Sequence, residues 1–200
     1  MNLFIIGPSG CGKSTQAKLI AEKYGLTHFS MGQLLRDEMA EQSVLGLEAK
    51  VYVDQGRWVP NPLIYRILTA KLETVNNQNF IIDGFPRHFD QGVMMEQYLT
   101  SKQQAIDAII HLDVTFEEII KRRTIQAEAG HRFSNVGRTD ETPASIAARQ
   151  KSYEETINPI LDYFQSKNKL WRIEGNRPID PIFADICSLI NTKLNLLVEK

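Results

Sequence analysis

The sequence lacks the features that mark disulfide-rich and membrane proteins. Its 200 residues include two cysteines, Cys11 and Cys187, which are too few for a disulfide framework or a four-cysteine zinc site. No segment approaches the ~18 consecutive apolar residues of a membrane-spanning helix. The first apolar run, Leu3–Ile6, is short and lacks the basic residues of a signal peptide. We therefore expect a reduced, cytoplasmic protein with no membrane partner.

An excess of charge of one sign is also missing. The 23 Lys and Arg residues nearly balance the 24 Asp and Glu residues, so the formal net charge is −1. This balance argues against a protein that coats nucleic acid, and no nucleic-acid partner is expected. Hydrophobic residues at 42% and charged residues at 24% are typical of a soluble globular chain. The length predicts one domain, residues 1–200, with a core that needs no disulfides.

Short apolar runs alternate with longer helical patterns, which predicts an α/β fold with a five-stranded parallel sheet and helices on both faces. The expected strands are Leu3–Ile6, Thr27–Phe29, Phe80–Ile82, Ala108–Leu112 and Leu170–Ile173. The expected helices are Lys13–Tyr24, Met31–Glu41, Pro60–Val75, Gln91–Leu99, Phe116–Glu128, Pro143–Ser166 and Pro181–Val198. Two stretches, 30–72 and 124–141, depart from the alternation and are candidates for excursions such as lids.

The segment Gly7–Ser14 fits the phosphate-loop pattern G-x-x-x-x-G-K-[ST] in full, between an expected strand and an expected helix. Glycines let successive backbone N–H groups point at phosphate oxygens, and the following helix presents its positive end to the same anion. Lys13 supplies a charge for the terminal phosphates, and Ser14 or Thr15 supplies a hydroxyl for the magnesium shell. The ATP-binding residues expected here are Gly10, Cys11, Gly12, Lys13, Ser14 and Thr15, with Cys11 as a small filler of the loop.

A second candidate centre follows the strand Phe80–Ile82. Asp83 lies where phosphate-loop enzymes place the carboxylate that holds magnesium waters, and the turn after it can direct Arg87 over the strand ends. Phosphoryl transfer needs several cations around the transferred group, and arginine matches phosphate oxygens in pairs. Candidate arginines come from five separate segments: Arg36, Arg87, Arg122, Arg138 and Arg149.

With these motifs, the chain closely resembles the adenylate kinase family of nucleoside monophosphate kinases, from about Leu3 to Ile186. The resemblance rests on motifs in the same order along the chain: GPSGCGKSTQ at 7–16, FSMGQLLRDE at 29–38, GRWVPNPL at 56–63, IIDGFPRHFDQ at 81–91, GRTDETPASIAAR at 137–149 and GNRPI at 175–179.

The resemblance implies reversible transfer of the γ-phosphoryl group of ATP to AMP, with Mg²⁺ accompanying the nucleotide and no metal ligated directly by the protein. It also implies a core, a monophosphate-binding subdomain at 30–60 and a short LID at 123–138. The LID has no cysteines, so no zinc is expected, and short-LID relatives are usually monomers.

The resemblance assigns residues to each substrate. For AMP, these are Ser30, Met31, Arg36, Arg57, Val59, Gly84, Arg87, Gln91, Arg138 and Arg149, with Gly32 and Val53 also near the base. For ATP, they include Arg122 at the base and Arg177 and Pro178 in a loop beside it, with Gly175. The catalytic set is Lys13, Asp83, Arg87, Arg122, Arg138 and Arg149, with Mg²⁺ near Ser14 and Asp83. A helix that starts at Pro143 puts Arg149 two turns in, so it meets Arg138 on one phosphate when the LID closes.

Several positions depart from the family pattern. Gln33 and Asn61 replace aspartates, and Met31 replaces a threonine near the acceptor base. Gln126 replaces a second arginine of the LID helix; Arg123 and Arg132 are both candidates to compensate. Two alternatives therefore stay open: a UMP or CMP kinase of the same fold, against which Gln91 argues, and a nucleotide-binding sensor without transfer activity.

Overall fold

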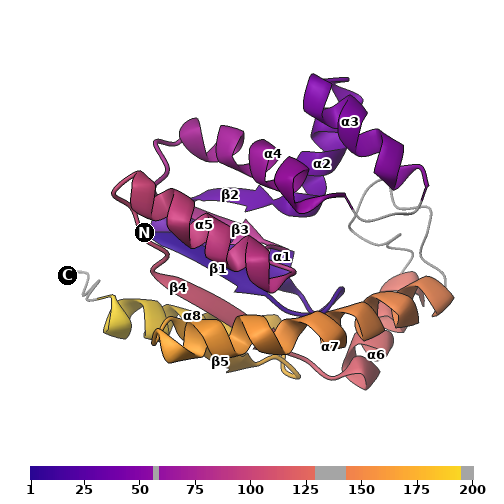
Figure 1. The fold of residues 1–200 in the computed structure, drawn as a ribbon. Coiled ribbons are helices and arrows are strands. Elements are labelled where there is room, and N and C mark those ends of the chain that lie inside the picture. The colour runs from indigo at the N-terminus through magenta and orange to yellow at the C-terminus, as the bar shows by residue number, and fades with distance from the viewer. Residues whose placement is uncertain (56–58, 129–142, 195–200) are drawn as a thin grey trace.

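A five-stranded parallel sheet forms the centre of the computed structural model, which describes residues 1–55, 59–128 and 143–194, without the side chains of 126–128 and 143–145. The strand order is β2-β3-β1-β4-β5, as drawn in Figure 1. The strands are β1 (Asn2–Ile6), β2 (Thr27–Ser30), β3 (Phe80–Asp83), β4 (Ala108–Asp113) and β5 (Leu170–Glu174). The expected α/β class and all five expected strands are confirmed, with ends shifted by no more than one residue.

Helices cover both faces of this sheet (Figure 1), as the alternating sequence pattern predicts. The described helices are α1 (Lys13–Tyr24), α2 (Met31–Ala40), α3 (Val44–Val53), α4 (Asn61–Glu73), α5 (Phe89–Ser101), α6 (Phe116–Glu128), α7 (Pro143–Ser166) and α8 (Ile179–Lys193).

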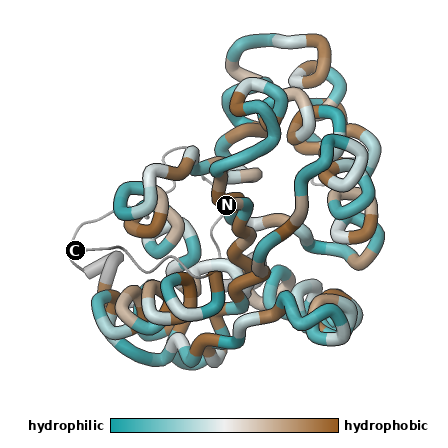
Figure 2. Tube along the Cα trace, turned by 90° about the vertical axis from the view of Figure 1, so that its left-hand side faces the viewer, coloured by the Kyte–Doolittle hydropathy of each residue, from teal (hydrophilic) through white to brown (hydrophobic). Residues whose placement is uncertain are grey.

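The alternation of side chains along each strand divides the apolar core into two clusters. Phe4 and Ile82 point into the cluster that the helices α4, α5 and α7 cover. Leu3 and Ile81, one residue away on the same strands, point into the cluster that α1 and α8 cover. In Figure 2 the hydrophobic residues gather along the central strands, and the hydrophilic residues lie mainly on the outer helix surfaces. Because both faces of the sheet are buried, its strands need nearly continuous apolar runs.

Helix α3 was not expected from the sequence. Ser43 begins it, with its Oγ accepting a hydrogen bond of 2.9 Å from the N–H of Gly46. Helices α2 and α3 pack so closely that a Cβ on Gly46 would lie 1.9 Å from the carbonyl oxygen of Glu38. Val44 (78% exposed) and Val51 (56% exposed) face solvent, so α3 lacks the apolar stripe that predicts a helix.

The predicted end of α8 was wrong, whereas its predicted start was shifted by two residues. The helix begins at Ile179 rather than Pro181, because a proline in the first turn removes no helical hydrogen bond. It ends at Lys193, and the residues that the prediction added, up to Val198, lie mostly beyond the described part of the chain. The other expected helices are confirmed with ends shifted by no more than two residues. None of the described helices is long and apolar enough to cross a membrane.

Candidate active site

The phosphate loop connects β1 to α1 at the carboxyl edge of the sheet, where all the parallel strands end. Gly12 precedes α1 with φ 101°, a left-handed conformation that favours glycine. The Lys13 ammonium donates hydrogen bonds to the carbonyl oxygens of Gly7 (2.9 Å) and Pro8 (2.7 Å). These bonds hold the lysine charge at the mouth of the loop, beside the N-terminus of α1. The ammonium and the positive end of the helix together form a site suited to phosphate.

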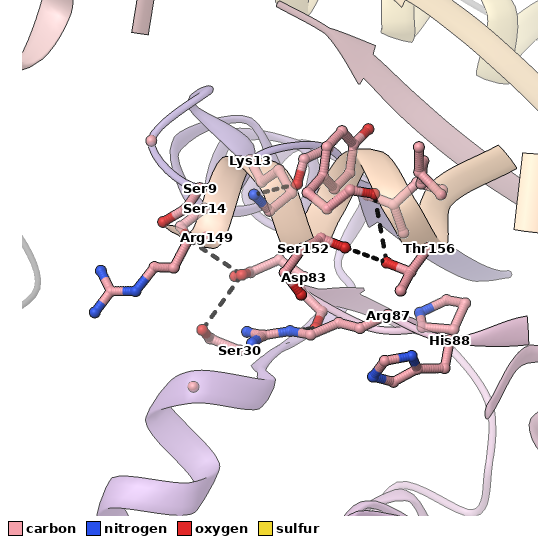
Figure 3. A pocket seen from close by; sticks show the side chains of 18 of the residues that line it. Ser9, Lys13, Ser14, Ser30, Asp83, Arg87, His88, Arg149, Ser152 and Thr156 are labelled. Carbon is pink, nitrogen blue, oxygen red and sulfur yellow. Dashed lines mark hydrogen bonds between the residues drawn. The ribbon is translucent and has the colours of Figure 1, made fainter. Parts of the chain in front are cut away.

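Asp83 ends β3 in register with Ser30 on β2, and it is only 4% exposed. Its Oδ1 accepts hydrogen bonds from the hydroxyls of Ser14 (3.2 Å) and Ser30 (3.3 Å), as Figure 3 shows. Its Oδ2 lies 2.6 Å from Nε2 of His28. The carboxylate is thus fixed by three side chains from the phosphate-loop helix and the neighbouring strand.

His28 is a site residue that the sequence reasoning missed. It lies two residues before Ser30 on β2, so both side chains point to the same side of the strand. The spacing of two residues from Ser30, which was expected at the site, could have predicted that His28 faces the same side of the strand. A histidine there can form a hydrogen bond with the Asp83 carboxylate.

The oxygen donors at Asp83 fit Mg²⁺. Magnesium in nucleotide enzymes is bound through one or two carboxylates, substrate phosphates and several retained waters. Asp83 and the Ser14 hydroxyl offer hard oxygens next to the phosphate loop. No group of three His, Cys, Asp or Glu side chains in the described ranges is arranged to hold a metal by itself. This donor set suits a metal that arrives with a nucleotide better than one held by protein ligands alone.

A cavity of about 280 Å³ opens over the phosphate loop, and cationic side chains from four segments line it. They are Lys13, Arg36, Arg87 and Arg149. The Arg87 Nε donates to the carbonyl oxygen of Gly84 (2.9 Å), and the Arg36 Nη2 donates to Oε1 of Gln33 (2.6 Å). In Figure 3, Arg87 lies alongside Asp83, whereas Arg149 enters from α7 with its guanidinium directed away from Asp83.

A second cavity of about 430 Å³ adjoins the first and shares Gly84, Arg87 and His88 with it. Its other lining residues are largely apolar and include Met31, Leu35, Val53, Val59 and Ile64. Gln91, 6% exposed, and Asn61 supply the polar groups of its wall. The backbone N–H of Arg87 donates to Oε1 of Gln91 (2.7 Å), and Nε2 of Gln91 donates to Oδ1 of Asn61 (2.8 Å). The second cavity therefore offers an apolar slot with a fixed amide at its edge.

Arg122 links three segments: its own helix α6, the phosphate loop and the loop after β5. Its guanidinium donates to the carbonyl oxygens of Cys11 (3.0 Å), Gly175 (2.5 Å) and Arg177 (3.2 Å). Its Nε donates to Glu118 at 2.9 Å, and this bond keeps the pKa of Glu118 below its usual range. Arg177 in turn donates to Asp185 at 2.6 Å. The contacts of Arg122 place the loop after β5 beside the phosphate loop.

Not all of the expected site residues line the two cavities. The expected ATP residues Cys11, Gly12, Thr15, Arg122, Arg177 and Pro178 lie outside both linings. Cys11 is 1% exposed and packs in the core, which agrees with a filler role. Arg57 and Arg138 lie outside the described residues, as do Arg132 and most of the expected LID.

Of the two candidates to compensate for Gln126, the structure describes Arg123. Its side chain is 7% exposed and reaches the phosphate loop, where Nη2 lies 3.5 Å from the carbonyl oxygen and 3.4 Å from the hydroxyl of Ser9. A Cβ on Gly10 would lie 2.9 Å from Nε of Arg123, so the loop and this guanidinium are in close contact. Arg123 thus brings a positive charge to the loop from α6.

Comparisons with known proteins agree with this geometry. Residues 5–169 match the family model described as adenylate kinase. An adenylate kinase of Clostridium tetani is 32% identical, with 95% of this chain and 98% of that protein covered. An adenylate kinase of Prochlorococcus marinus is 35% identical, covering 92% of this chain and 95% of the relative. One from Archaeoglobus fulgidus is 30% identical over 95% of this chain and 98% of the relative.

Proposed function

The chain belongs to the adenylate kinase family and is a nucleotide-binding phosphotransferase, and on this premise we propose that it reversibly transfers the γ-phosphoryl group of ATP to AMP, giving two ADP. The single observation that supports this reaction best is the pair of adjoining cavities with Arg87 in their shared wall. One cavity contains the phosphate loop, and the other is an apolar slot for a base. Two nucleotides bound there meet with their phosphates near Arg87.

The cationic side chains of the first cavity perform most of the catalysis in this proposal. Phosphoryl transfer asks little of a protein beyond aligning the two oxygens and stabilising charge on the transferred group. Lys13 contacts the terminal phosphates of ATP, Arg36 and Arg87 hold the acceptor phosphate, and Arg149 reaches the transferred group. The acceptor phosphate is already an anion, so no general base is needed.

Asp83 orients the water shell of the metal in this proposal. Mg²⁺, when it arrives with ATP, neutralises charge on the β- and γ-phosphates. Asp83 and the Ser14 hydroxyl would hold this ion and its waters, and His28 and Ser30 keep the carboxylate in place. Gln33, which bonds to Arg36 and Asp37, contributes no carboxylate to this network.

Gln91 favours adenine as the acceptor base. Its Oε1 is occupied by the N–H of Arg87, so its Nε2 is the group turned toward Asn61 and the slot. Nε2 carries two N–H groups: one bonds to Asn61, and the other can donate to a ring nitrogen of the base. Oδ1 of Asn61 has a second lone pair, which can accept a hydrogen bond from an exocyclic amino group. Adenine presents that pair of groups on one edge, whereas uracil presents an oxygen and an N–H, so the hydrogen bonds favour adenine over uracil; cytosine carries the same pair on a smaller ring.

The proposal retains the division of the chain expected from the sequence. Residues 30–60 act as the monophosphate-binding subdomain and 123–138 as the LID, with Arg57 at the acceptor and Arg138 at the transferred group. Arg122, Arg177 and Pro178 border the ATP base. Closure of the LID would exclude water and limit hydrolysis. A monomer in the cytoplasm is part of the same proposal.

A product assay tests the proposal directly. The protein is incubated with ATP, Mg²⁺ and one of AMP, dAMP, CMP, UMP or GMP, and the nucleotides are separated and quantified. We expect AMP to be the best acceptor and ADP to be the product. A preference for CMP or UMP would assign the chain to pyrimidine acceptors. Binding of ATP and AMP without formation of ADP would refute transfer and favour a sensor.

A further inference from the structure

A hydrogen-bonded His–Tyr pair, in which the histidine is buried and the tyrosine is partly exposed, lies beneath the phosphate loop and is not used by the proposed reaction. His111 on β4 is 5% exposed and stands in register with Ile6, the last residue of β1 before the loop. Its Nε2 lies 2.7 Å from the hydroxyl oxygen of Tyr153 on α7, and the two rings are stacked with an interplanar angle of 27°. The pair connects the long helix α7 to the sheet at the carboxyl edge.

Both members of this pair are neutral at physiological pH. Burial lowers the pKa of His111 from its ordinary 6.5 to about 4, although Asp113 opposes the shift while Arg172 and Lys13 add to it. Burial also raises the pKa of Tyr153 above its usual range. The hydrogen bond therefore joins two uncharged groups.

Tyr153 and Arg149 occupy the same face of α7. They are four residues apart, which places them one helical turn from each other, and both line the first cavity. The rest of the contact between α7 and the core is largely apolar and includes Ile157, Ile160 and Phe164. Apolar contacts are not directional, whereas a short hydrogen bond fixes the rotation and register of a helix.

We propose that Tyr153 is a positioning residue for phosphoryl transfer, and that its hydrogen bond to His111 sets the place on α7 from which Arg149 reaches the transferred group. The inference rests on the proposed function. Small displacements are costly in such a site, since a shift of about 1 Å can reduce the rate by ~10²-fold. Tyr153 is outside the catalytic set because it acts through Arg149.

Two tyrosine variants of α7 test this inference as a matched pair. Tyr153→Phe removes the hydroxyl that bonds to His111, and Tyr163→Phe removes one that donates to Glu96 of α5 at 2.6 Å, ten residues further along α7. We expect Tyr153→Phe to lower kcat by roughly 10-fold while KM for ATP and AMP changes less than about twofold. Tyr163→Phe should leave kcat at the wild-type level. Each variant loses one hydrogen bond, so Tm should fall in both.

Substitutions at His111 provide a second route to the same test if Tyr153→Phe does not fold. His111→Leu removes the partner of the Tyr153 hydroxyl and should reproduce the loss in kcat. His111→Gln offers an amide of similar reach and should restore much of it. A purely structural role would give no such ordering at temperatures well below Tm.

The double variant of Tyr153→Phe with Arg149→Ala decides whether the effect passes through Arg149. If the inference holds, Tyr153→Phe costs little further kcat once Arg149 is gone. Wild-type kcat in folded Tyr153→Phe, or full additivity in the double variant, would overturn it. Absence of transfer in the wild-type protein would instead refute the proposed function, so the two failures are distinguishable.

Discussion

The side-chain amide of Gln91 donates to Oδ1 of Asn61 at 2.8 Å, and this bond defines the polar edge of the acceptor slot. The orientation of Gln91 follows from the backbone N–H of Arg87, which can only donate and is 2.7 Å from Oε1. Asn61 must then present its oxygen to Nε2. An aspartate at this position would offer the same acceptor with a charge, whereas asparagine keeps the slot neutral.

We expect Gln91→Leu to reduce the preference for AMP over UMP by about tenfold or more, because a site built to hydrogen-bond a base loses discrimination when its polar group is removed. Rates with each acceptor, expressed as kcat/KM, measure the change. Asn61→Asp is the matched control, since it retains the acceptor oxygen and should keep AMP as the best substrate. An unchanged base preference in Gln91→Leu would remove Gln91 from the acceptor site.

Lys13→Met should reduce kcat by roughly 10²-fold or more, as the loss of one preorganised charge donor does in other enzymes. The ammonium is held at the loop by the carbonyl oxygens of Gly7 and Pro8, so no neighbouring cation replaces it at the same point. Steady-state kinetics with saturating ATP and AMP provide the measurement. Lys18→Met, at an exposed position of α1, is the control and should be fully active. Near-normal turnover of Lys13→Met would contradict the role given to Lys13.

Arg149→Ala should lower kcat by about 10²-fold and change the dissociation constant of ATP much less. The reason is that Arg149 enters the first cavity from α7 and makes its contact mainly when charge develops on the transferred group. Equilibrium titration with ATP and steady-state assays separate the two quantities. Lys151→Ala removes a nearby, 79% exposed cation of the same helix and should have no effect. Equal losses in binding and turnover would indicate a simple binding residue.

The free energy of unfolding should decrease as the pH is lowered through the range in which histidine ordinarily titrates. Because the folded state holds the pKa of His111 near 4 instead of 6.5, the unfolded chain takes up the proton first as pH falls. His111 therefore stabilises the fold fully above pH 6.5 and loses about 3 kcal/mol of that contribution between pH 7 and pH 4. Urea unfolding at both pH values measures the change.

His111→Gln is the control for this pH dependence, since an amide does not titrate. The variant should lose less stability than the wild type between pH 7 and pH 4. Glu38 and Glu96, whose pKa values are held below the usual range by Ser43 and by Lys167 with Lys169, add a further loss toward acid pH in both proteins. Parallel pH profiles of the two proteins would show that His111 is not the group responsible.

Gly46→Ala should destabilise the protein by more than ~1 kcal/mol, although alanine is the better helix former. Its Cβ would lie 1.9 Å from the carbonyl oxygen and 2.2 Å from the carbonyl carbon of Glu38, so α2 and α3 must separate. Thermal unfolding measures the effect. Glu48→Ala, at a partly exposed position of the same helix, should change Tm far less. A stabilised Gly46→Ala variant would mean that the two helices yield easily.

Helix α3 illustrates where local patterns fail to predict structure. Several large apolar side chains between Val44 and Val53 face solvent. The apolar residues of this segment therefore do not form the single stripe by which a helix is predicted from sequence. The helix exists because Ser43 caps it and Gly46 allows close packing on α2, and neither effect has a period along the sequence. The strands, by contrast, carry their pattern locally, since both faces of the sheet are buried.

The sequence by itself determined the α/β fold and the phosphate loop, because residues close together in the chain encode them. Only the tertiary structure decided that His28 holds Asp83, that Tyr153 reaches His111, and that Arg123 lies against the phosphate loop. These pairs join residues 42 to 114 positions apart. Their formation depends on strand register and on how each helix packs, which no local motif specifies.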